Sequence, residues 1–285
     1  MLLFIVLVIG GTTYTLFRLR SETLDAQLEI SATYAHVFED HLTQTLKFIR
    51  LILTQSISEN DLNQPPEKVS ALLARTVRQT PALRSISLID EQGRIVASSN
   101  RDNIGISPGA IDCFPPSTDN KDYFGIGRLW AGRDFQQGKV KTGERPLESN
   151  ELPGFIPVVH ALHLGKRQIT LVANINPDFL VNNFSQKLVS EKGFVEVLRY
   201  DGILLVSTAE TSSHRLHRAE AELLKNISEK ETGSFLENLP NQPGTITSYR
   251  ASSQFPVLVI TRLDQRQALK KWNEERSMLL LIVIP

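Results

Sequence analysis

Residues 85–99 read SISLIDEQGRIVASS, and residues 194–208, FVEVLRYDGILLVST, repeat their pattern. Each stretch has apolar residues on both sides of a short polar turn, which is the pattern of two antiparallel strands joined as a hairpin. The two can be laid on each other without a gap, so that position 85 matches 194 and position 99 matches 208. Gly93 then falls on Gly202, and a tight hairpin favours glycine because glycine tolerates positive φ. The sequence therefore predicts two copies of one structural unit.

Two more strand-like segments and a helix start follow each hairpin. The segments are FIPVVHAL (155–162) and RQITLVANI (167–175) in the first copy, and GTITSYRA (244–251) and QFPVLVITRL (254–263) in the second. The helix starts are Asn176-Pro177-Asp178 and Asp264. The predicted fold class is therefore α+β: a long N-terminal helix followed by two tandem modules, each an antiparallel sheet flanked by helices.

The segment from Ser21 to about Ser56 predicts the long helix, since it lacks proline and glycine and carries two apolar stripes. The first stripe comprises Leu24, Leu28, Ser31, Ala35, Phe38, Leu42, Thr45, Ile49 and Ile52. The second comprises Ile30, Tyr34, Val37, His41, Gln44, Phe48 and Leu51. Two stripes predict two neighbours, the helix's own domain and a second copy in a homodimer, although a purely intramolecular helix fits them equally well. After Pro65-Pro66, Glu67 to Gln79 predicts a shorter amphipathic helix.

Both ends of the chain are apolar. Leu2 to Phe17 carries no charge and nearly matches a hydrocarbon core of about 30 Å. Ser277 to Pro285 reads as the first half of a second membrane helix. A cleavable signal peptide is the alternative for the first segment, but neither a basic stretch nor an A-x-A site accompanies it. Basic residues such as Arg18 and Lys271 flank the soluble part. Basic flanks tend to lie on the cytoplasmic side of a membrane, so they disfavour an outward placement of this part.

These patterns predict six segments. They are a transmembrane helix (1–20), a stalk helix (21–60), a membrane-distal module (61–180), a membrane-proximal module (181–264), an exit helix (265–276) and the start of a second transmembrane helix (277–285). The net charge is zero, so nucleic acid is not an expected partner. The single cysteine excludes an intrachain disulfide.

The order of these elements resembles the double Cache family, the tandem PAS-like extracytoplasmic sensor domains of bacterial chemoreceptors, histidine kinases and diguanylate cyclases. The resemblance covers roughly residues 21–276. It rests on IDEQGRIVASS (89–99), on Asp122-Tyr123-Phe124, and on FPVLVITRLDQRQALKKW (255–272). It implies a non-enzymatic sensor in the cell inner membrane, with its soluble part periplasmic or extracellular. It also implies a small ligand, an organic acid or an amino-acid-like molecule, in the distal module, and a histidine kinase or diguanylate cyclase as the output.

The loop from Asp122 to Arg145 concentrates charged and aromatic side chains. A pocket for an organic acid needs a guanidinium, which holds both carboxylate oxygens, and aromatic walls that exclude water. The predicted ligand-binding residues are Asp122, Tyr123, Arg128, Trp130, Arg133 and Asn174. The alternative is that the arginines are solvated, that Trp130 belongs to the core, and that Asn174 caps a helix.

No motif predicts catalysis, a cofactor or a metal site. His160 and His163 would lie on a strand with their side chains on opposite faces, and phosphate-binding and nucleophile-elbow motifs are absent from the sequence. Two rival functions stand beside the sensor. One is a ligand-free dimerisation scaffold, and the other is a secreted hydrolase, for which the sequence offers no pair of nucleophile and base.

Overall fold

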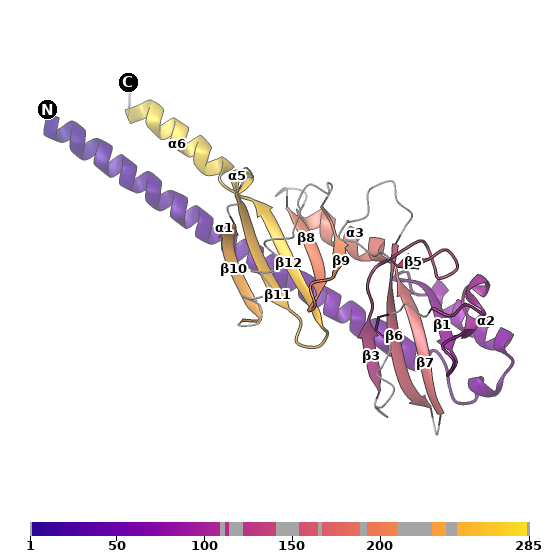
Figure 1. Cartoon of the computed structure of the whole chain (residues 1–285). Coiled ribbons are helices and arrows are strands. Elements are labelled where there is room, and N and C mark those ends of the chain that lie inside the picture. Colours follow the sequence, from indigo (N-terminus) through magenta and orange to yellow (C-terminus); the bar gives the residue numbers. More distant parts are fainter. Residues whose placement is uncertain are drawn as a thin grey trace.

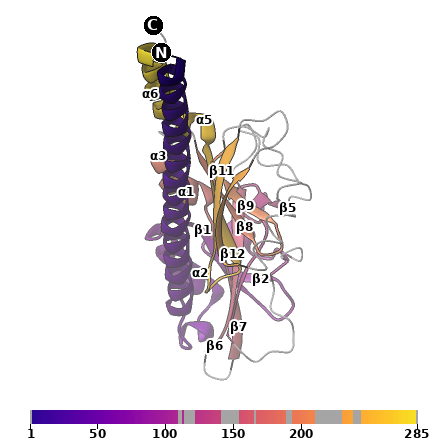
Figure 2. The same ribbon diagram turned by 90° about the vertical axis from the view of Figure 1, so that its left-hand side faces the viewer.

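A single long helix carries two antiparallel sheets, one after the other along its length. The computed structural model describes residues 2–108, 112–113, 122–140, 154–164, 167–188, 193–209, 230–237 and 244–283. Helix α1 (Leu2–Gln55) runs from the N-terminal end past both sheets, which lie on the same side of it (Figures 1 and 2). The predicted α+β class is thereby confirmed.

The distal module follows α1. Its elements are η1 (Asp61–Asn63), α2 (Pro66–Arg78), β1 (Leu83–Ile89), β2 (Ile95–Ser98), η2 (Arg101–Asn103), β3 (Tyr123–Ile126), β4 (Trp130–Ala131), β5 (Lys139–Val140), β6 (Gly154–Leu164) and β7 (Arg167–Ile175). The strand order is β2-β1-β7-β6-β4-β5, and β3 also pairs with β6. Helix α2 matches the predicted short helix to within one residue at each end. The proline at its first position suits a helix start, because the N–H that proline lacks would have no partner there.

The proximal module has a five-stranded sheet in the order β10-β11-β12-β8-β9. Its elements are α3 (Pro177–Leu188), β8 (Phe194–Arg199), β9 (Leu204–Ser207), β10 (Thr232–Glu237), β11 (Thr245–Ala251), β12 (Val257–Asp264), α5 (Gln265–Ala268) and α6 (Lys270–Val283). The order β9-β8-β12-β11 repeats the order β2-β1-β7-β6 of the distal sheet. Asp264 begins α5 as its N-cap and accepts a hydrogen bond from the Gln267 backbone N–H at 2.9 Å.

The repeat inferred from the gapless match of the two hairpins holds at the level of single hydrogen bonds. Each hairpin has a bulge at the same place, between Leu88 and Ile89 and between Val197 and Leu198. Gly93 and Gly202 both have positive φ, +76° and +83°. The two hydroxyls that end the compared stretches, those of Ser99 and Thr208, accept from the backbone N–H groups of Ile86 and Val195 at 3.0 and 2.9 Å. The hairpins are therefore two copies of one local structure.

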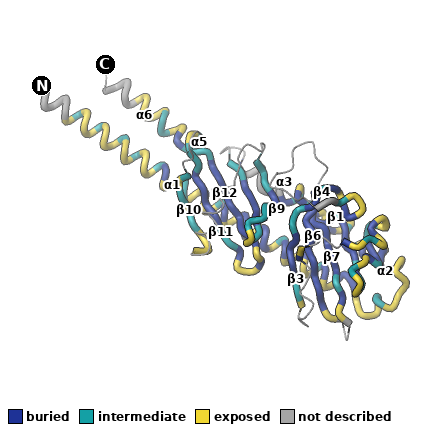
Figure 3. The backbone as a smooth tube through the Cα atoms, in the orientation of Figure 1, coloured by how far each residue is buried: buried dark blue, intermediate teal, exposed yellow. Residues whose placement is uncertain are grey.

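The first apolar stripe of α1 packs against both sheets. Phe38 and Ile49 on this stripe are at most 1% exposed, and one continuous core joins α1 to the inner faces of the two sheets. The second stripe faces outward, with Phe48 54% exposed and Leu51 51% exposed. Figure 3 shows the buried residues concentrated in the strands, whereas the N-terminal part of α1 and most of α6 are intermediate or exposed.

The two ends of the chain lie side by side (Figure 1). The Trp272 indole of α6 donates a hydrogen bond to the Leu16 carbonyl of α1 at 3.2 Å. Within the described residues, no helix combines the length and the apolar character that crossing a membrane requires.

Candidate functional site

A cavity of about 850 Å³ opens in the distal module, where β1 begins and β7 ends. The segment after β4, η2 and the first residues of α3 complete its wall. It is lined by Val77, Pro81, Leu83, Arg84, Ser99, Asn100, Asp102, Arg133, Asp134, Gln136, Gln137, Asn176 and Asp178. Its size falls in the range of small-molecule pockets, and its lining carries charges of both signs.

Asp134 forms the polar floor of this cavity. Its carboxylate accepts hydrogen bonds from the Asn174 amide at 2.7 Å, the Ser85 hydroxyl at 2.9 Å and the Asn100 amide at 3.2 Å. Asp134 is only 6% exposed, and Ser85 and Asn174 are almost fully buried. Hydrogen bonds from three surrounding elements hold this carboxylate in one place, so the cavity has a fixed negative group in its wall.

Two guanidinium groups supply the positive side of the lining. Arg84 donates to the Asn176 amide oxygen at 2.8 Å and forms an ion pair with Asp178 at 3.0 Å. Burial lowers the pKa of Arg84, and the neighbouring carboxylate of Asp178 opposes this shift. Arg133 is exposed and lines the same cavity. Together, Arg84 and Arg133 give the cavity the chemistry to bind a carboxylate, while Asp134 and Asp178 suit a cationic group.

The structure does not bring the six predicted ligand-binding residues together. Arg133 lines the cavity, and Asn174 lies behind Asp134. The Asn174 side-chain oxygen has no hydrogen-bond partner in the part of the chain that the structure describes. The other four predicted residues lie elsewhere, and residues 141–145 at the end of the predicted ligand loop fall outside the described residues.

Trp130 belongs to an aromatic cluster on the outer face of the distal sheet. Its ring lies 5.5 Å from the Phe135 ring, edge to face, and 5.6 Å from the Phe155 ring. Trp130 is 6% exposed and Phe155 is fully buried. The cluster packs beside the cavity floor, because Phe135 directly follows Asp134. Trp130 thus occupies the core position that the sequence left as the alternative to a ligand contact.

Asp122 and Tyr123 lie at the edge strand β3. Asp122 is exposed and lies 3.6 Å from His163. The Tyr123 hydroxyl lies across Gly125, where a Cβ would come within 2.6 Å of it, and burial raises the pKa of this phenol. Neither residue lines the cavity.

The next residue of β3, Phe124, packs inward. It contacts His160 edge to face at 5.8 Å and the Phe255 ring of the proximal module at 5.4 Å. Burial, together with the nearby charge of Arg50, lowers the pKa of His160. The aspartate-tyrosine-phenylalanine element therefore lies partly at the junction of the two modules.

Arg128 lies at the same junction. Its guanidinium forms an ion pair with Asp112 at 3.1 Å, and Arg199 of the proximal module pairs with the same carboxylate at 2.8 Å. Arg128 and Arg133 are close together in sequence, yet Arg128 lies at the junction of the modules and Arg133 lines the cavity.

Sequence reasoning missed Arg84, Asn100 and Asn176 as cavity residues. Arg84 lies at the start of β1, and Asn100 and Asn176 lie just after β2 and β7, where no local pattern marks them as functional. One available signal was Asp134, which follows Arg133 directly in the predicted ligand loop.

A buried ion pair occupies the corresponding place in the proximal module. Asn174 pairs with Ser85 in the distal sheet, and Phe194, which matches Ser85 in the repeat, pairs with Arg262. Arg262 is 5% exposed and forms an ion pair with Glu196, while its Nε lies 3.7 Å from Glu237. The proximal module thus holds a cation and two carboxylates of its own where the distal module places Asn174 and the cavity.

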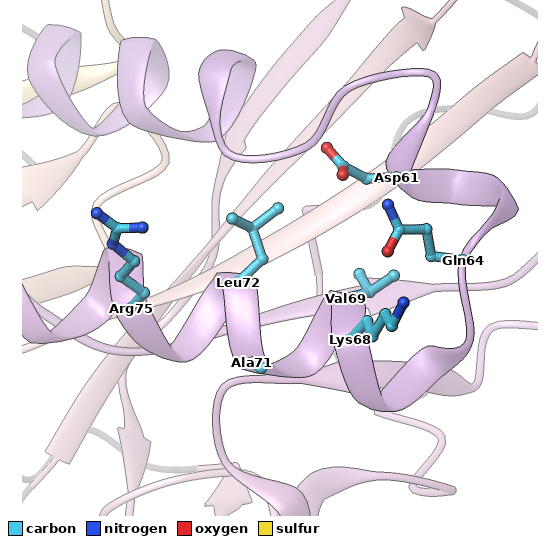
Figure 4. A pocket seen from close by; sticks show the side chains of 7 residues that line it. All are labelled: Asp61, Gln64, Lys68, Val69, Ala71, Leu72 and Arg75. Carbon is cyan, nitrogen blue, oxygen red and sulfur yellow. The ribbon is translucent and has the colours of Figure 1, made fainter.

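A second pocket, of about 320 Å³, lies between η1 and α2. Figure 4 shows Asp61, Gln64 and Lys68 gathered at one end of it, with Arg75 at the other. Its walls come from two successive elements of the chain. Among the described residues, His36, Glu39 and Asp40 could in principle ligate a metal, but the Glu39 carboxylate accepts from Thr43 at 2.6 Å and is therefore already engaged.

The chain has the fold of extracytoplasmic sensory domains. It superposes on the extracellular domain of the histidine kinase rpHK1S-Z16 with a TM-score of 0.64 and 16% identity, covering 87% of this chain and 98% of the other. The ligand-binding domain of the Pseudomonas aeruginosa chemoreceptor PctB, in complex with L-Gln, gives 0.54 and 10%, covering 90% and 99%. That of the Pseudomonas fluorescens chemoreceptor CtaA, with L-isoleucine, gives 0.55 and 13%, covering 89% and 97%.

These likenesses confirm the predicted resemblance at the level of the fold: the chain shares the fold of solved sensory domains of histidine kinases and chemoreceptors. By sequence alone, no family model and no curated protein matches it.

Proposed function

We propose that this chain is the extracytoplasmic ligand-sensing part of a bacterial membrane receptor, and that it binds a small molecule in the distal module. The observation that carries the proposal is the 850 Å³ cavity, whose lining includes Arg84, Arg133 and Asp134. The ligand class is a small molecule with a carboxylate and a second polar or cationic group, such as an amino acid. The ligands in two similar solved structures, L-Gln and L-isoleucine, have this chemistry.

Signal output would pass through the C-terminal helices. Strand β12 continues into α5 and α6, and α6 contacts α1 through Trp272. The predicted membrane anchors, 1–20 and 277–285, stay a proposal that rests on the apolar sequence of the two ends, since no described helix has the length and apolar character of a membrane span. The predicted boundaries of the two modules, 61–180 and 181–264, stay part of this proposal, although the boundary at 180/181 falls inside α3. A ligand that prefers one arrangement of α1 and α6 would shift the receptor toward that arrangement.

The ligand site is tested by replacing the two predicted arginines one at a time. The full chain in detergent is screened by thermal shift and calorimetry against L-amino acids and dicarboxylates. Arg133→Gln should weaken binding of the active compound at least about tenfold, because it removes a charged donor to a carboxylate. Arg94→Gln is the matched control, since Arg94 is exposed and lies outside the cavity.

Two results would contradict the site. Loss of binding with Arg128→Gln but not with Arg133→Gln would move the site to the predicted Arg128–Trp130 stretch. A wild-type chain that shifts with no compound would favour the ligand-free scaffold.

The second stripe of α1 is proposed as a homodimer contact. Ile30 and Val37 are each 39% exposed, and Phe48 and Leu51 are more than half exposed, so one face of a long helix presents apolar side chains to solvent. A second copy of the same helix would cover this face.

Phe48→Glu should shift the oligomer toward monomer, because it places a charge in an apolar contact. Analytical ultracentrifugation of the detergent-solubilised chain measures the change. Lys47→Glu, at an exposed neighbouring position outside the stripe, is the control. A Phe48→Glu chain with the wild-type sedimentation profile would count against the contact.

A further inference from the structure

Four charged residues join the two modules in a junction cluster: Asp112, Arg128, Arg199 and Asp201. Asp112 and Arg128 belong to the distal module, whereas Arg199 and Asp201 lie at the β8–β9 turn of the proximal module. Arg199 Nη1 donates to Asp112 Oδ2 at 2.8 Å, and Arg128 Nε donates to the same oxygen at 3.1 Å. Arg199 also forms an ion pair with Asp201. The four charges cancel, and one carboxylate oxygen serves two arginines.

Asp112 is the central member of the cluster. Its side chain is 18% exposed and that of Arg199 is 13% exposed, so water screens this pair less than a surface pair. Burial acts to raise the pKa of Asp112, but hydrogen bonds from Arg128 and the charge of Arg199 outweigh it and lower the pKa. Its other oxygen accepts from the Arg128 backbone N–H at 3.0 Å. Without this carboxylate, two guanidiniums would face each other.

The cluster is connected to the ligand cavity by a short, pinned segment. Arg128 begins this segment and Arg133 ends it at the cavity. Between them, Trp130 and Ala131 form β4 and pair with Phe155 and Gly154 of β6. Arg128 and Arg133 therefore flank one short strand, and a shift of β4 against β6 would displace both arginines.

The cluster is connected to the exit helix on its other side. Arg199 is the last residue of β8 and is paired with Val257 at the start of β12, the strand that runs into α5. Arg199 also donates to the Ile126 carbonyl of β3 at 3.0 Å. Contacts through Arg199 thus tie the distal module to the strand pair that leads to the C-terminal helices.

We propose that the junction cluster transmits the occupancy of the distal cavity to β8 and β12. A ligand that draws Arg133 inward moves Arg128 at the other end of the segment. This movement changes how Asp112 is shared between Arg128 and Arg199. The inference rests on the proposed ligand site for its input, but the coupling between the modules exists with or without ligand.

The coupling itself is tested without ligand by hydrogen–deuterium exchange on the full chain. Asp112→Asn removes the charge and keeps the shape, and Arg94→Gln removes a surface ion pair outside the cluster as control. We expect amides of β8 and β12 to exchange at least tenfold faster in Asp112→Asn and at the wild-type rate in Arg94→Gln. Amides of α2, which lies away from the junction, should keep their wild-type rate.

A double-mutant cycle distinguishes loss of the Asp112–Arg199 interaction from unspecific destabilisation of the protein. Arg199→Gln should accelerate the same amides, and Asp112→Asn combined with Arg199→Gln should be no faster than the faster single variant. Wild-type exchange in β8 and β12 of Asp112→Asn, or additive effects in the double variant, would overturn the proposal.

The ligand arm uses L-glutamine and succinate as probes. A probe that binds should slow exchange in β1 and change exchange in β12 of the wild-type chain. In Asp112→Asn the slowing in β1 should remain, and the change in β12 should be lost. A retained β12 response would overturn the relay. If neither probe protects β1 in the wild type, the ligand class fails for these probes, and the ligand-free measurement still decides on the coupling.

Discussion

Glu196→Leu is expected to lower the free energy of unfolding by about 3–5 kcal/mol, because it leaves the Arg262 guanidinium buried without its main partner. Arg262 is 5% exposed and Glu196 is 2% exposed. The remaining carboxylate, Glu237, lies 3.7 Å from Arg262 Nε and compensates only in part. Urea denaturation of wild type and variant, followed by circular dichroism, measures the difference.

Loss of a proton from Arg262 would not relieve the cost of an unpaired buried charge. Burial lowers the pKa of Arg262 to about 10 in the wild-type chain, and a guanidinium keeps its proton in proteins, so the variant retains the charge. The triple variant Glu196→Leu, Glu237→Gln, Arg262→Met removes the cation and both carboxylates and keeps most of the side-chain volume. Its stability should return to within about 1.5 kcal/mol of wild type or exceed it, since paired buried charges bring little net stability.

Glu22→Leu is the matched control. Glu22 pairs with Arg18 on the surface of α1, with both side chains more than half exposed. A surface pair of this kind contributes less than about 1 kcal/mol. If Glu196→Leu lowered the free energy of unfolding no more than Glu22→Leu does, the predicted contribution of the buried pair would be wrong.

Phe155→Ala should have an effect of similar size, with a loss of about 3–5 kcal/mol. Phe155 is fully buried and contacts both Trp130 and Phe135, at ring distances of 5.6 and 5.2 Å. Its removal leaves a cavity that the surrounding strands cannot close, because β6 is paired on both sides, with β7 and with β3 and β4. Phe155→Leu keeps most of the volume and should cost less than about 1.5 kcal/mol.

Tryptophan emission gives a second readout of this variant. The chain has two tryptophans, Trp130 and Trp272. Phe155→Ala should shift the emission to longer wavelength, as Trp130 loses a packing partner. A Trp130→Phe background should abolish this shift. An unchanged spectrum and unchanged stability together would show that the aromatic cluster is not packed as described.

The fold was largely predictable from the sequence. The hairpin pattern, the turn glycines Gly93 and Gly202, and the apolar stripes of α1 are local signals, and each depends on residues close together in the chain. The gapless match between 85–99 and 194–208 carried the prediction of two modules, and the matching bulges confirm it. The assignment of the second stripe of α1 to a dimer partner stays a prediction.

The candidate site was predictable only in part. Arg133 was named from its loop, and Asn174 from the end of its strand. The sequence could not place Arg128 and Trp130, because a strand as short as β4 (Trp130–Ala131) gives no pattern that tells which side chains face a cavity, a core or a neighbouring module. The aromatic cluster and the junction cluster each use one of these two residues.

The order of the elements, the repeat and the two apolar stripes of the long helix follow from periodicity and turn chemistry along the chain. Which stripe packs on the sheets, and which charges share a space, depends on the tertiary structure. Ser85, Asp134 and Asn174 come from three separate segments, and so do Asp112, Arg128 and Arg199. These groups come into contact because sheet pairing brings distant strand ends together, and no local sequence pattern indicates such a contact.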